Sequence, residues 1–152
     1  MSTVYIGIGS NLGSREDNCK AAVRHLIDNG IKVLKLSSMI ETEPWGVKDQ
    51  PKFINMAVKV ETGLGPEELL LLLKQIEAEI GRRQTIHWGP RVIDLDILLY
   101  DDLVLKTPEL EIPHPGISER YFVLKPLSDI APEIIHPVIK KSIEELLNEI
   151  SK

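Results

Sequence analysis

Cysteine, aromatic residues and surplus positive charge are all scarce in this chain of 152 residues. The single cysteine, Cys19, excludes an intrachain disulfide and any zinc site built from cysteines. The longest strongly apolar run, residues 69–73, is far shorter than the ~18 residues that span a membrane. The net charge of −5 argues against nucleic acid as a partner, because proteins that bind its backbone carry a basic surplus. The first residues show no signal peptide, so we expect a cytoplasmic protein without a membrane partner.

The remaining composition is that of an ordinary globular domain. Hydrophobic residues make up 43% of the chain and charged residues 27%, close to the average of folded domains. A chain of this length buries roughly 70% of the surface that its unfolded form exposes, which is enough for a core without disulfides. We therefore expect a single domain over residues 1–152, with a monomer as the expected state and an oligomer left open.

Apolar periodicity and turn residues predict an α+β fold. Strands are expected at residues 3–8, 31–40, 53–60 and 92–100, and helices at residues 14–29 and 66–80. This order, βαββαβ, is that of the ferredoxin-like fold, an antiparallel-rich sheet with helices on its faces. After it we expect a hairpin around residues 101–102, with residues 103–105 as its return strand, and a helix near residues 118–125. Ser142 and Glu145 have the spacing of a capping box and predict a last helix.

The expected strand at residues 92–100 carries two acids in a pattern suited to a metal ion. Side chains alternate between the two faces of a strand, so the core face is expected to hold Ile93, Leu95, Ile97 and Leu99. Asp94 and Asp96 then share the other face, with Cα atoms roughly 7 Å apart. Such a carboxylate pair suits Mg²⁺ that also carries substrate phosphates. The alternative is a solvated sheet face that bears two acids.

A basic segment leads into this strand. Residues 81–91 (GRRQTIHWGPR) contain arginines and a histidine but no acid. The planar guanidinium groups of Arg82, Arg83 and Arg91 match phosphate oxygens. Trp88 can stack on a flat ring, and the glycines at both ends suit a lid that moves on hinges. The alternative is an ordinary basic surface loop. Acids for a metal beside arginines for phosphate are typical of phosphoryl transfer.

Two further groups of residues could contact a ligand. His114, in a proline-rich loop, could donate to phosphate, serve as a turn residue or become a phosphorylated nucleophile, and Arg120 follows it as a second cation. Trp45 and Phe53 can sandwich a planar heterocycle, although core packing is the alternative for Phe53. Asn55 offers a donor and an acceptor to an amide-like ring edge.

Other polar positions allow more than one interpretation. Lys74 and Glu77 lie three residues apart on one helix face, where they either pair with each other or border a nucleotide. The histidines have no metal-ligand spacing, and His25 and His136 are expected at the surface. The glycine-rich segment at residues 7–13 is neither a dinucleotide fingerprint nor a P-loop, so we interpret it as a tight strand-to-helix turn that permits close approach of another element.

Four segments of the chain resemble one enzyme family. They read YIGIGSNLG near the start, TEPWG through DQPKFIN, GRRQTIHWGPRVIDLDILLY, and IPHPGISERYFVLKPLSDIAPE. The family is 6-hydroxymethyl-7,8-dihydropterin pyrophosphokinase, and the resemblance covers about residues 3–137. It implies a ferredoxin-like fold and transfer of the diphosphoryl group of ATP to the hydroxymethyl oxygen of the pterin, with AMP as the second product and two Mg²⁺ ions assisting.

The resemblance also implies roles for individual residues. Asp94 and Asp96 would bind the metal and, with Arg82 and Arg91, carry catalysis. ATP would contact Lys74, Glu77, Arg82, Arg83, Trp88, Arg91, Ile97, His114 and Arg120. The pterin would contact Thr42, Pro44, Trp45, Phe53, Asn55, Trp88 and Phe122.

Two other classes of protein compete with a kinase. A ferredoxin-like RNA-binding module would present aromatic residues on its central strands, but the first strand offers only Tyr5. A metabolite-sensing or assembly domain would not need a carboxylate pair beside an arginine-rich loop, and it would not turn over ATP.

Overall fold

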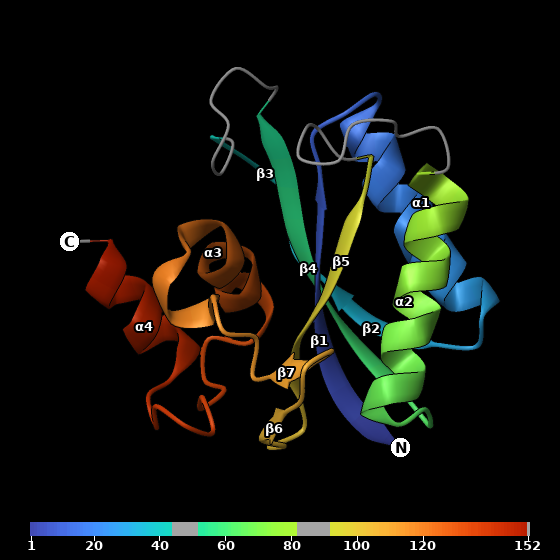
Figure 1. Ribbon diagram of the computed structural model, residues 1–152. Coiled ribbons are helices and arrows are strands. Elements are labelled where there is room, and N and C mark those ends of the chain that lie inside the picture. The colour runs from blue at the N-terminus through green and yellow to red at the C-terminus, as the bar shows by residue number, and fades with distance from the viewer. Residues whose placement is uncertain (44–51, 82–91, 152) are drawn as a thin grey trace.

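The structure, a computed structural model, describes residues 1–43, 52–81 and 92–151 and consists of a sheet between two layers of helices (Figure 1). Its strands are β1 (Ser2–Ser10), β2 (Lys32–Leu36), β3 (Ile40–Thr42), β4 (Phe53–Thr62), β5 (Asp94–Tyr100), β6 (Leu105–Lys106) and β7 (Glu111–Ile112). Its helices are α1 (Arg15–Asp28), α2 (Pro66–Gly81), α3 (Tyr121–Ile130) and α4 (Ile143–Ile150), with a 3-10 turn at Ile117–Glu119. None of the described helices is long and apolar enough to cross a membrane.

The main sheet is antiparallel throughout and has the spatial order β2, β4, β1, β5. The short strand β3 also pairs with β4, next to the place where β2 ends. Strand β1 is therefore central, and β5 forms one edge of the main sheet. This order is that of the ferredoxin-like fold, which confirms the predicted fold class. Helices α1 and α2 cover one face of the sheet, and α3 and α4 cover the other (Figure 1).

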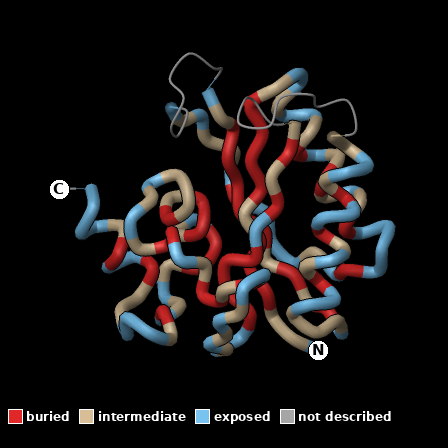
Figure 2. The backbone as a smooth tube through the Cα atoms, viewed as in Figure 1, coloured by how far each residue is buried: buried red, intermediate tan, exposed pale blue. Residues whose placement is uncertain are grey.

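Each face of the sheet has its own apolar core. On one side, α1 and α2 contribute Cys19, Ala22, Leu26, Leu69, Leu73 and Ile76, which pack against Ile6, Ile8, Leu95 and Ile97. On the other side, α3 and α4 contribute Leu124, Leu127, Ile130, Ile143 and Leu146, which pack against Tyr5, Ala57, Leu98 and Leu99. Figure 2 shows the buried residues along the central strands and on the inner sides of the helices. The sheet is thus fixed from both faces over much of its length.

The helix boundaries follow local signals in the sequence. Helix α1 is followed by Gly30, whose φ of 83° lies in the left-handed region that favours glycine. Helix α4 begins with the expected capping box, in which Ser142 Oγ accepts the N–H of Glu145 and the Glu145 carboxylate accepts the N–H of Ser142. In place of the helix expected near residues 118–125, the structure has the 3-10 turn Ile117–Glu119 followed by α3, which begins at Tyr121.

The single strand expected at residues 31–40 is wrong, because the structure divides it into β2 and β3. Between them, the Ser37 N–H donates to the Ala57 carbonyl, and the Ser37 hydroxyl accepts the N–H of Ala57 at 2.8 Å. A side chain thus replaces a backbone acceptor at this point. The regular ladder stops there, although the chain remains attached to β4.

The hairpin expected at residues 101–102 is wrong in its return strand, although the turn itself is present, with the Leu103 N–H donating to the Tyr100 carbonyl at 3.0 Å. Asp101 is tied to β1, because its N–H donates to the Thr3 carbonyl and its carboxylate accepts the N–H of Thr3, both at 2.8 Å. The segment after β5 does not pair back onto β5. Instead, β6 forms a two-residue ladder with β7, in which Leu105 lies opposite Ile112.

Two smaller expectations are corrected as well. A register shift between Tyr5 and Ile6 breaks the alternation of β5, so Leu99 packs in the core beneath α3 and not in the core that holds Ile93, Leu95 and Ile97. His136, expected at the surface, is only 6% exposed. Its Nδ1 accepts the N–H groups of Val138 and Ile139, so it organises a turn.

Candidate active site

Strand β5 presents two carboxylates on one face, as the alternating pattern predicts. Leu95 is 4% exposed and Ile97 is 3% exposed, and both point into the core beneath α1 and α2. Asp96 on the opposite face is exposed, and Asp94 is half-buried. Burial of the leucine and isoleucine therefore fixes the direction in which both carboxylates point.

Two glycines of β1 lie directly opposite these acids. Gly7 pairs with Asp96, and Gly9 pairs with Asp94. Because opposed residues of antiparallel strands project from the same face, β1 places no side chain beside either carboxylate. On its other side Gly9 pairs with Asn55 of β4. Strand spacing places the Cα atoms of Asn55 and Asp94 about 10 Å apart. The aspartates thus border a strip of the sheet, Gly7 to Gly9, to which β1 adds only glycine beside the acids.

Gly9 is required by the close approach of Asn55. A Cβ atom at position 9 would lie 2.9 Å from Asn55 Oδ1, closer than packed atoms tolerate. The Asn55 amide nitrogen donates to Thr42 Oγ1 at 2.8 Å. This bond fixes the orientation of the amide and leaves Oδ1 above Gly9. An acceptor and a second N–H are thereby aimed over the strip.

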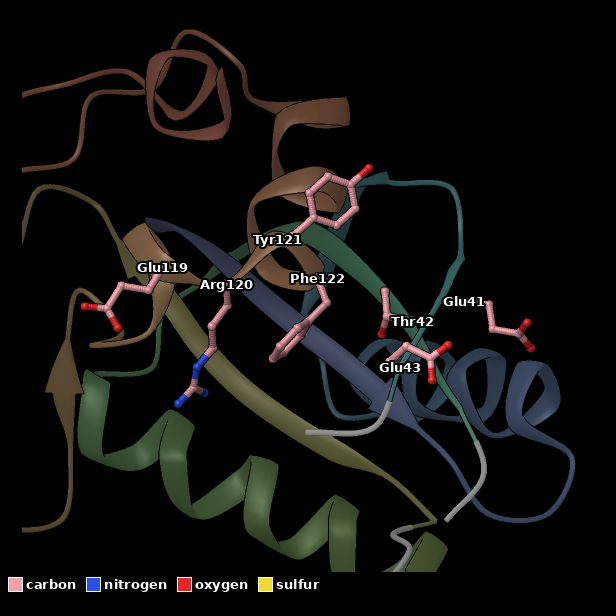
Figure 3. A pocket seen from close by; sticks show the side chains of 7 residues that line it. All are labelled: Glu41, Thr42, Glu43, Glu119, Arg120, Tyr121 and Phe122. Atoms are coloured by element: carbon pink, nitrogen blue, oxygen red, sulfur yellow. The ribbon is translucent and has the colours of Figure 1, made fainter. Parts of the chain in front are cut away.

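A cavity of about 490 Å³ opens between β3 and the start of α3 (Figure 3). Its lining residues are Glu41, Thr42, Glu43, Glu119, Arg120, Tyr121 and Phe122. Arg120 and Phe122 extend in the same general direction, whereas Tyr121 and Glu119 point away from them (Figure 3). The Arg120 guanidinium carbon lies 6.0 Å from the centre of the Phe122 ring, within reach of a cation–π contact. A cation and an aromatic ring therefore lie side by side at this cavity.

His114 lies beside the outer edge of β5. Its backbone N–H donates to the Leu98 carbonyl at 3.0 Å, and its Nδ1 accepts the N–H of Gly116 at 3.0 Å. Burial lowers the pKa of His114, the Asp96 carboxylate opposes that shift, and the Arg120 guanidinium adds to it. The neutral ring with Nδ1 as acceptor carries its proton on Nε2. His114 therefore offers one N–H donor.

Gly116 also makes room for Arg120. A Cβ atom at position 116 would lie 2.8 Å from Arg120 Nε. The absence of a side chain lets Arg120 fold back over the turn that holds His114. Residue 116 thus contacts both candidates, through its backbone N–H to His114 and through its missing side chain to Arg120, and the sequence did not single it out.

Glu77 joins α2 to the carboxylate strand. Its Oε2 accepts the backbone N–H of Leu95 at 2.7 Å. Burial raises the pKa of Glu77 to about 7; the bond from Leu95 opposes this rise, and the charges of Asp94 and Asp96 add to it. Lys74 favours the charged form of Glu77 through its own charge. Glu77 thus has a backbone partner on β5. Its expected contact with the nucleotide stays a prediction.

The structure covers only part of the expected site. It brings Asp94, Asp96, Asn55, Thr42, Gly7 and Gly9 onto one face, with His114 at the edge of β5. The expected contacts Pro44, Trp45, Arg82, Arg83, Trp88 and Arg91 lie outside the described residues. The Ile97 side chain is buried in the core, so only its main chain is open to a ligand. Within the described ranges no group of three or more acids, histidines or cysteines forms a metal site, so the assignment of a metal to Asp94 and Asp96 stays a prediction.

Sequence reasoning missed two residues that the structure connects to this site. Gly116 gave no signal, because its role depends on where Arg120 folds. The sequence signal for Arg15 was weak. It occupies the first position of a helix, where the helix dipole favours acids over bases. A base at this position indicates a partner elsewhere in the fold.

Comparison with known proteins identifies the class and then the family. The chain is a pyrophosphokinase, a transferase of folate synthesis. It belongs to the 7,8-dihydro-6-hydroxymethylpterin-pyrophosphokinase (HPPK) family, whose model matches residues 5–132. ATP is the co-substrate of that family, and this membership confirms the resemblance stated from the sequence.

Relatives of two kinds match the chain. The pyrophosphokinase of Aquifex aeolicus is 42% identical over 149 residues, which cover 98% of this chain and 92% of the relative. That of Bacillus subtilis is 47% identical and covers 86% of this chain and 78% of the relative. The folic acid synthesis protein fol1 of Pneumocystis carinii is 48% identical over 97% of this chain, which spans only 20% of that longer protein.

Solved structures support the fold. The HPPK-DHPS of Plasmodium falciparum with pteroate has a TM-score of 0.79 at 18% identity, and the match covers 97% of this chain and 42% of that one. At this level of identity the likeness concerns the fold alone.

Proposed function

We propose that the chain transfers the diphosphoryl group of ATP in one in-line step to the hydroxymethyl oxygen of 6-hydroxymethyl-7,8-dihydropterin, with Asp94 and Asp96 holding two Mg²⁺ ions. The observation that supports this proposal is the strip of β1 in which Gly7 and Gly9 lie opposite the two aspartates. The carboxylates lie beside it, between the amide of Asn55 on one side and His114 at the edge of β5 on the other. The pterin bound on the Asn55 side and ATP bound on the His114 side would meet at the aspartates.

The carboxylate pair fits magnesium by its chemistry and its surroundings. Carboxylate oxygens are hard ligands, and Mg²⁺ keeps several waters beside one or two protein carboxylates. Gly7 and Gly9 of β1 add no side chains of their own beside either acid. When bound, magnesium neutralises charge on phosphoryl oxygens. The protein's part is to hold Asp94 and Asp96 in place through the buried Leu95 and Ile97 and through the bond from Leu95 to Glu77.

The pterin is assigned to the part of the sheet around Asn55. We propose that the Asn55 amide binds the ring edge, with Thr42 orienting it, and that Phe53 and Phe122 grip the ring. The bond between Asn55 and Thr42 supports this assignment, because it fixes which amide atom is free to accept. Pro44 and Trp45 remain proposed contacts on this side.

The ATP side is assigned to His114 and Arg120 together with Lys74, Glu77 and the main chain of Ile97. His114 would donate from Nε2 to a phosphate oxygen, and Arg120 would supply a guanidinium fork. Because Nδ1 of His114 accepts the N–H of Gly116, neutral His114 has no free lone pair and does not act as the base for the hydroxyl. Arg82, Arg83, Trp88 and Arg91 remain proposed contacts.

Two measurements test this mechanism. Asp94→Asn and Asp96→Asn should each lower the rate of AMP formation from ATP, Mg²⁺ and the pterin at least ~10²-fold, comparable to loss of other groups that stabilise transition-state charge. Circular dichroism should show that both variants remain folded. Near-normal rates in both would refute the metal assignment.

The in-line step has its own test. A single displacement inverts the configuration at the transferred β-phosphorus, whereas a covalent enzyme intermediate formed and consumed by two displacements retains it. Isotopically chiral ATP should therefore give inverted product. Retention of configuration would instead indicate a phosphorylated nucleophile on the enzyme, such as His114. A single domain, a monomeric state and a cytoplasmic location stay predictions, and sedimentation would test the second.

A further inference from the structure

The guanidinium of Arg15 connects helix α1 to two neighbouring strands. Its Nη1 donates to the Lys52 carbonyl at 2.6 Å, and its Nη2 lies 3.0 Å from Glu41 Oε2. Glu41 belongs to β3, and Lys52 immediately precedes β4. We propose that Arg15 is a positioning residue that fixes the pair Thr42–Phe53 and thereby sets the affinity for the pterin. The inference rests on the proposed assignment of these two residues to the pterin side.

Arg15 acts from behind the substrate face. Glu41 pairs with Ile54, which is buried in the core beneath α1 and α2. Thr42 pairs with Phe53, and alternation sends both to the opposite face. In Figure 3 the carboxylate of Glu41 points away from Phe122. Arg15 therefore holds Glu41 and the Lys52 carbonyl, while Thr42, which lines the cavity, and Phe53 project from the other face of the strands.

The short strand needs such a contact. β3 has three residues, and its ladder with β4 ends at the pair Thr42–Phe53. Beyond this pair the described contact between the two strands is the ion pair of Lys52 and Glu43 at 3.5 Å, in which both side chains are more than half exposed. Exposed pairs of this kind contribute little. Arg15 is the better-placed contact, because its side chain is 29% exposed and it makes a charge-assisted bond to a main-chain oxygen.

The position of Arg15 in its helix supports a role beyond the helix. Arg15 is the first residue of α1, and Glu16 and Asp17 follow it in the same turn. The acids match the positive end of the helix dipole, whereas an arginine there is unfavourable. The contacts to Glu41 and Lys52 offset this local disadvantage. If this position served the stability of α1 alone, an acidic residue would be favoured over arginine.

The test is a comparison of Michaelis constants. Arg15→Ala should raise the KM for the pterin about fivefold, the loss expected for a contact of this strength. The KM for ATP and the kcat at saturating pterin should stay near the wild-type values. Glu41→Gln keeps the size of the side chain and should give a smaller rise, and the double variant should show less than the product of the two effects because the residues share one contact.

Matched controls separate this role from a loss of stability. Arg24 lies on the same helix and is exposed, so Arg24→Ala should leave both Michaelis constants unchanged. An Arg15→Ala enzyme with a wild-type pterin KM, or with equal rises for pterin and ATP, would overturn the inference. Failure of the proposed function would look different, because Asp94→Asn and Asp96→Asn would then keep their activity whatever the Arg15 variants do.

Discussion

The Glu77 carboxylate accepts a hydrogen bond of 2.7 Å from the backbone N–H of Leu95, the residue between Asp94 and Asp96. Because β5 is the edge of the main sheet, this N–H has no neighbouring strand to pair with, and a helix side chain satisfies it. The bond anchors the middle of the segment that carries both proposed metal ligands. It also brings a third acid close to them, and burial raises its pKa to about 7.

This raised pKa predicts a pH-dependent loss of stability in the metal-free protein. The folded state keeps the Glu77 proton up to about pH 7, whereas the unfolded chain releases it near the ordinary value of 4.5. The contribution of Glu77 to the free energy of unfolding is therefore full below about pH 4.5 and is lost as the pH rises through 7. Glu77→Gln keeps an acceptor for Leu95 but does not titrate.

Urea unfolding at about pH 5 and about pH 8 measures the difference. The wild type should lose up to about 3 kcal/mol relative to Glu77→Gln over this range. Glu67→Gln, an exposed position on the same helix, should follow the wild type. Parallel pH profiles for the wild type and Glu77→Gln would contradict the prediction.

A second prediction concerns the proton of His114. The side-chain nitrogen of glutamine can take the place of Nε2, whereas that of asparagine takes the place of Nδ1. Because Nδ1 is occupied by the N–H of Gly116, His114→Gln should keep most of the kcat/KM for ATP. His114→Asn should lose about 10- to 100-fold, the range for a hydrogen bond to a charged group. A reversed order of the two variants would show that Nδ1 faces the phosphate.

A third prediction concerns the space over Gly9. Gly9→Ala would put a methyl group 2.9 Å from Asn55 Oδ1, so the amide must turn away from its bond to Thr42. Calorimetric titration with the pterin and a non-hydrolysable ATP analogue should show pterin affinity at least about 10-fold weaker, the cost of one well-placed polar contact. Gly63→Ala is the control, since its methyl group would meet Met1 Sδ at an ordinary 3.7 Å. Unchanged pterin affinity in Gly9→Ala would remove Asn55 from the site.

A fourth prediction separates stability from activity. Ser142→Ala removes the side-chain oxygen that accepts the N–H of Glu145 at the start of α4. Loss of such a cap typically costs about 1 kcal/mol, which thermal unfolding can measure. The rate of AMP formation should not change, because α4 packs behind α3 and away from the carboxylate strip. A marked fall in that rate at temperatures where the variant is folded would show that α4 affects the site.

The sequence by itself determined the features that depend on neighbouring residues. A period of two in β5 sends Leu95 inward and Asp94 outward whatever the partner strand is. The left-handed position at Gly30 and the capping box of Ser142 are likewise local. The βαββαβ order follows from such patterns taken in succession, so the fold and the carboxylate pair could both be predicted.

Only the tertiary structure decided which distant atoms satisfy one another. Asp101 binds to Thr3, β6 pairs with β7 and not with β5, and a register shift that leaves Leu98 of β5 without a partner on β1 sends Leu99 to the other core. Glu77 finds Leu95, and Arg15 finds Lys52, because packing of the helices brings their side chains to unpaired backbone groups. Such backbone groups occur at every residue, so no pattern of side chains along the chain marks which one will lack a partner.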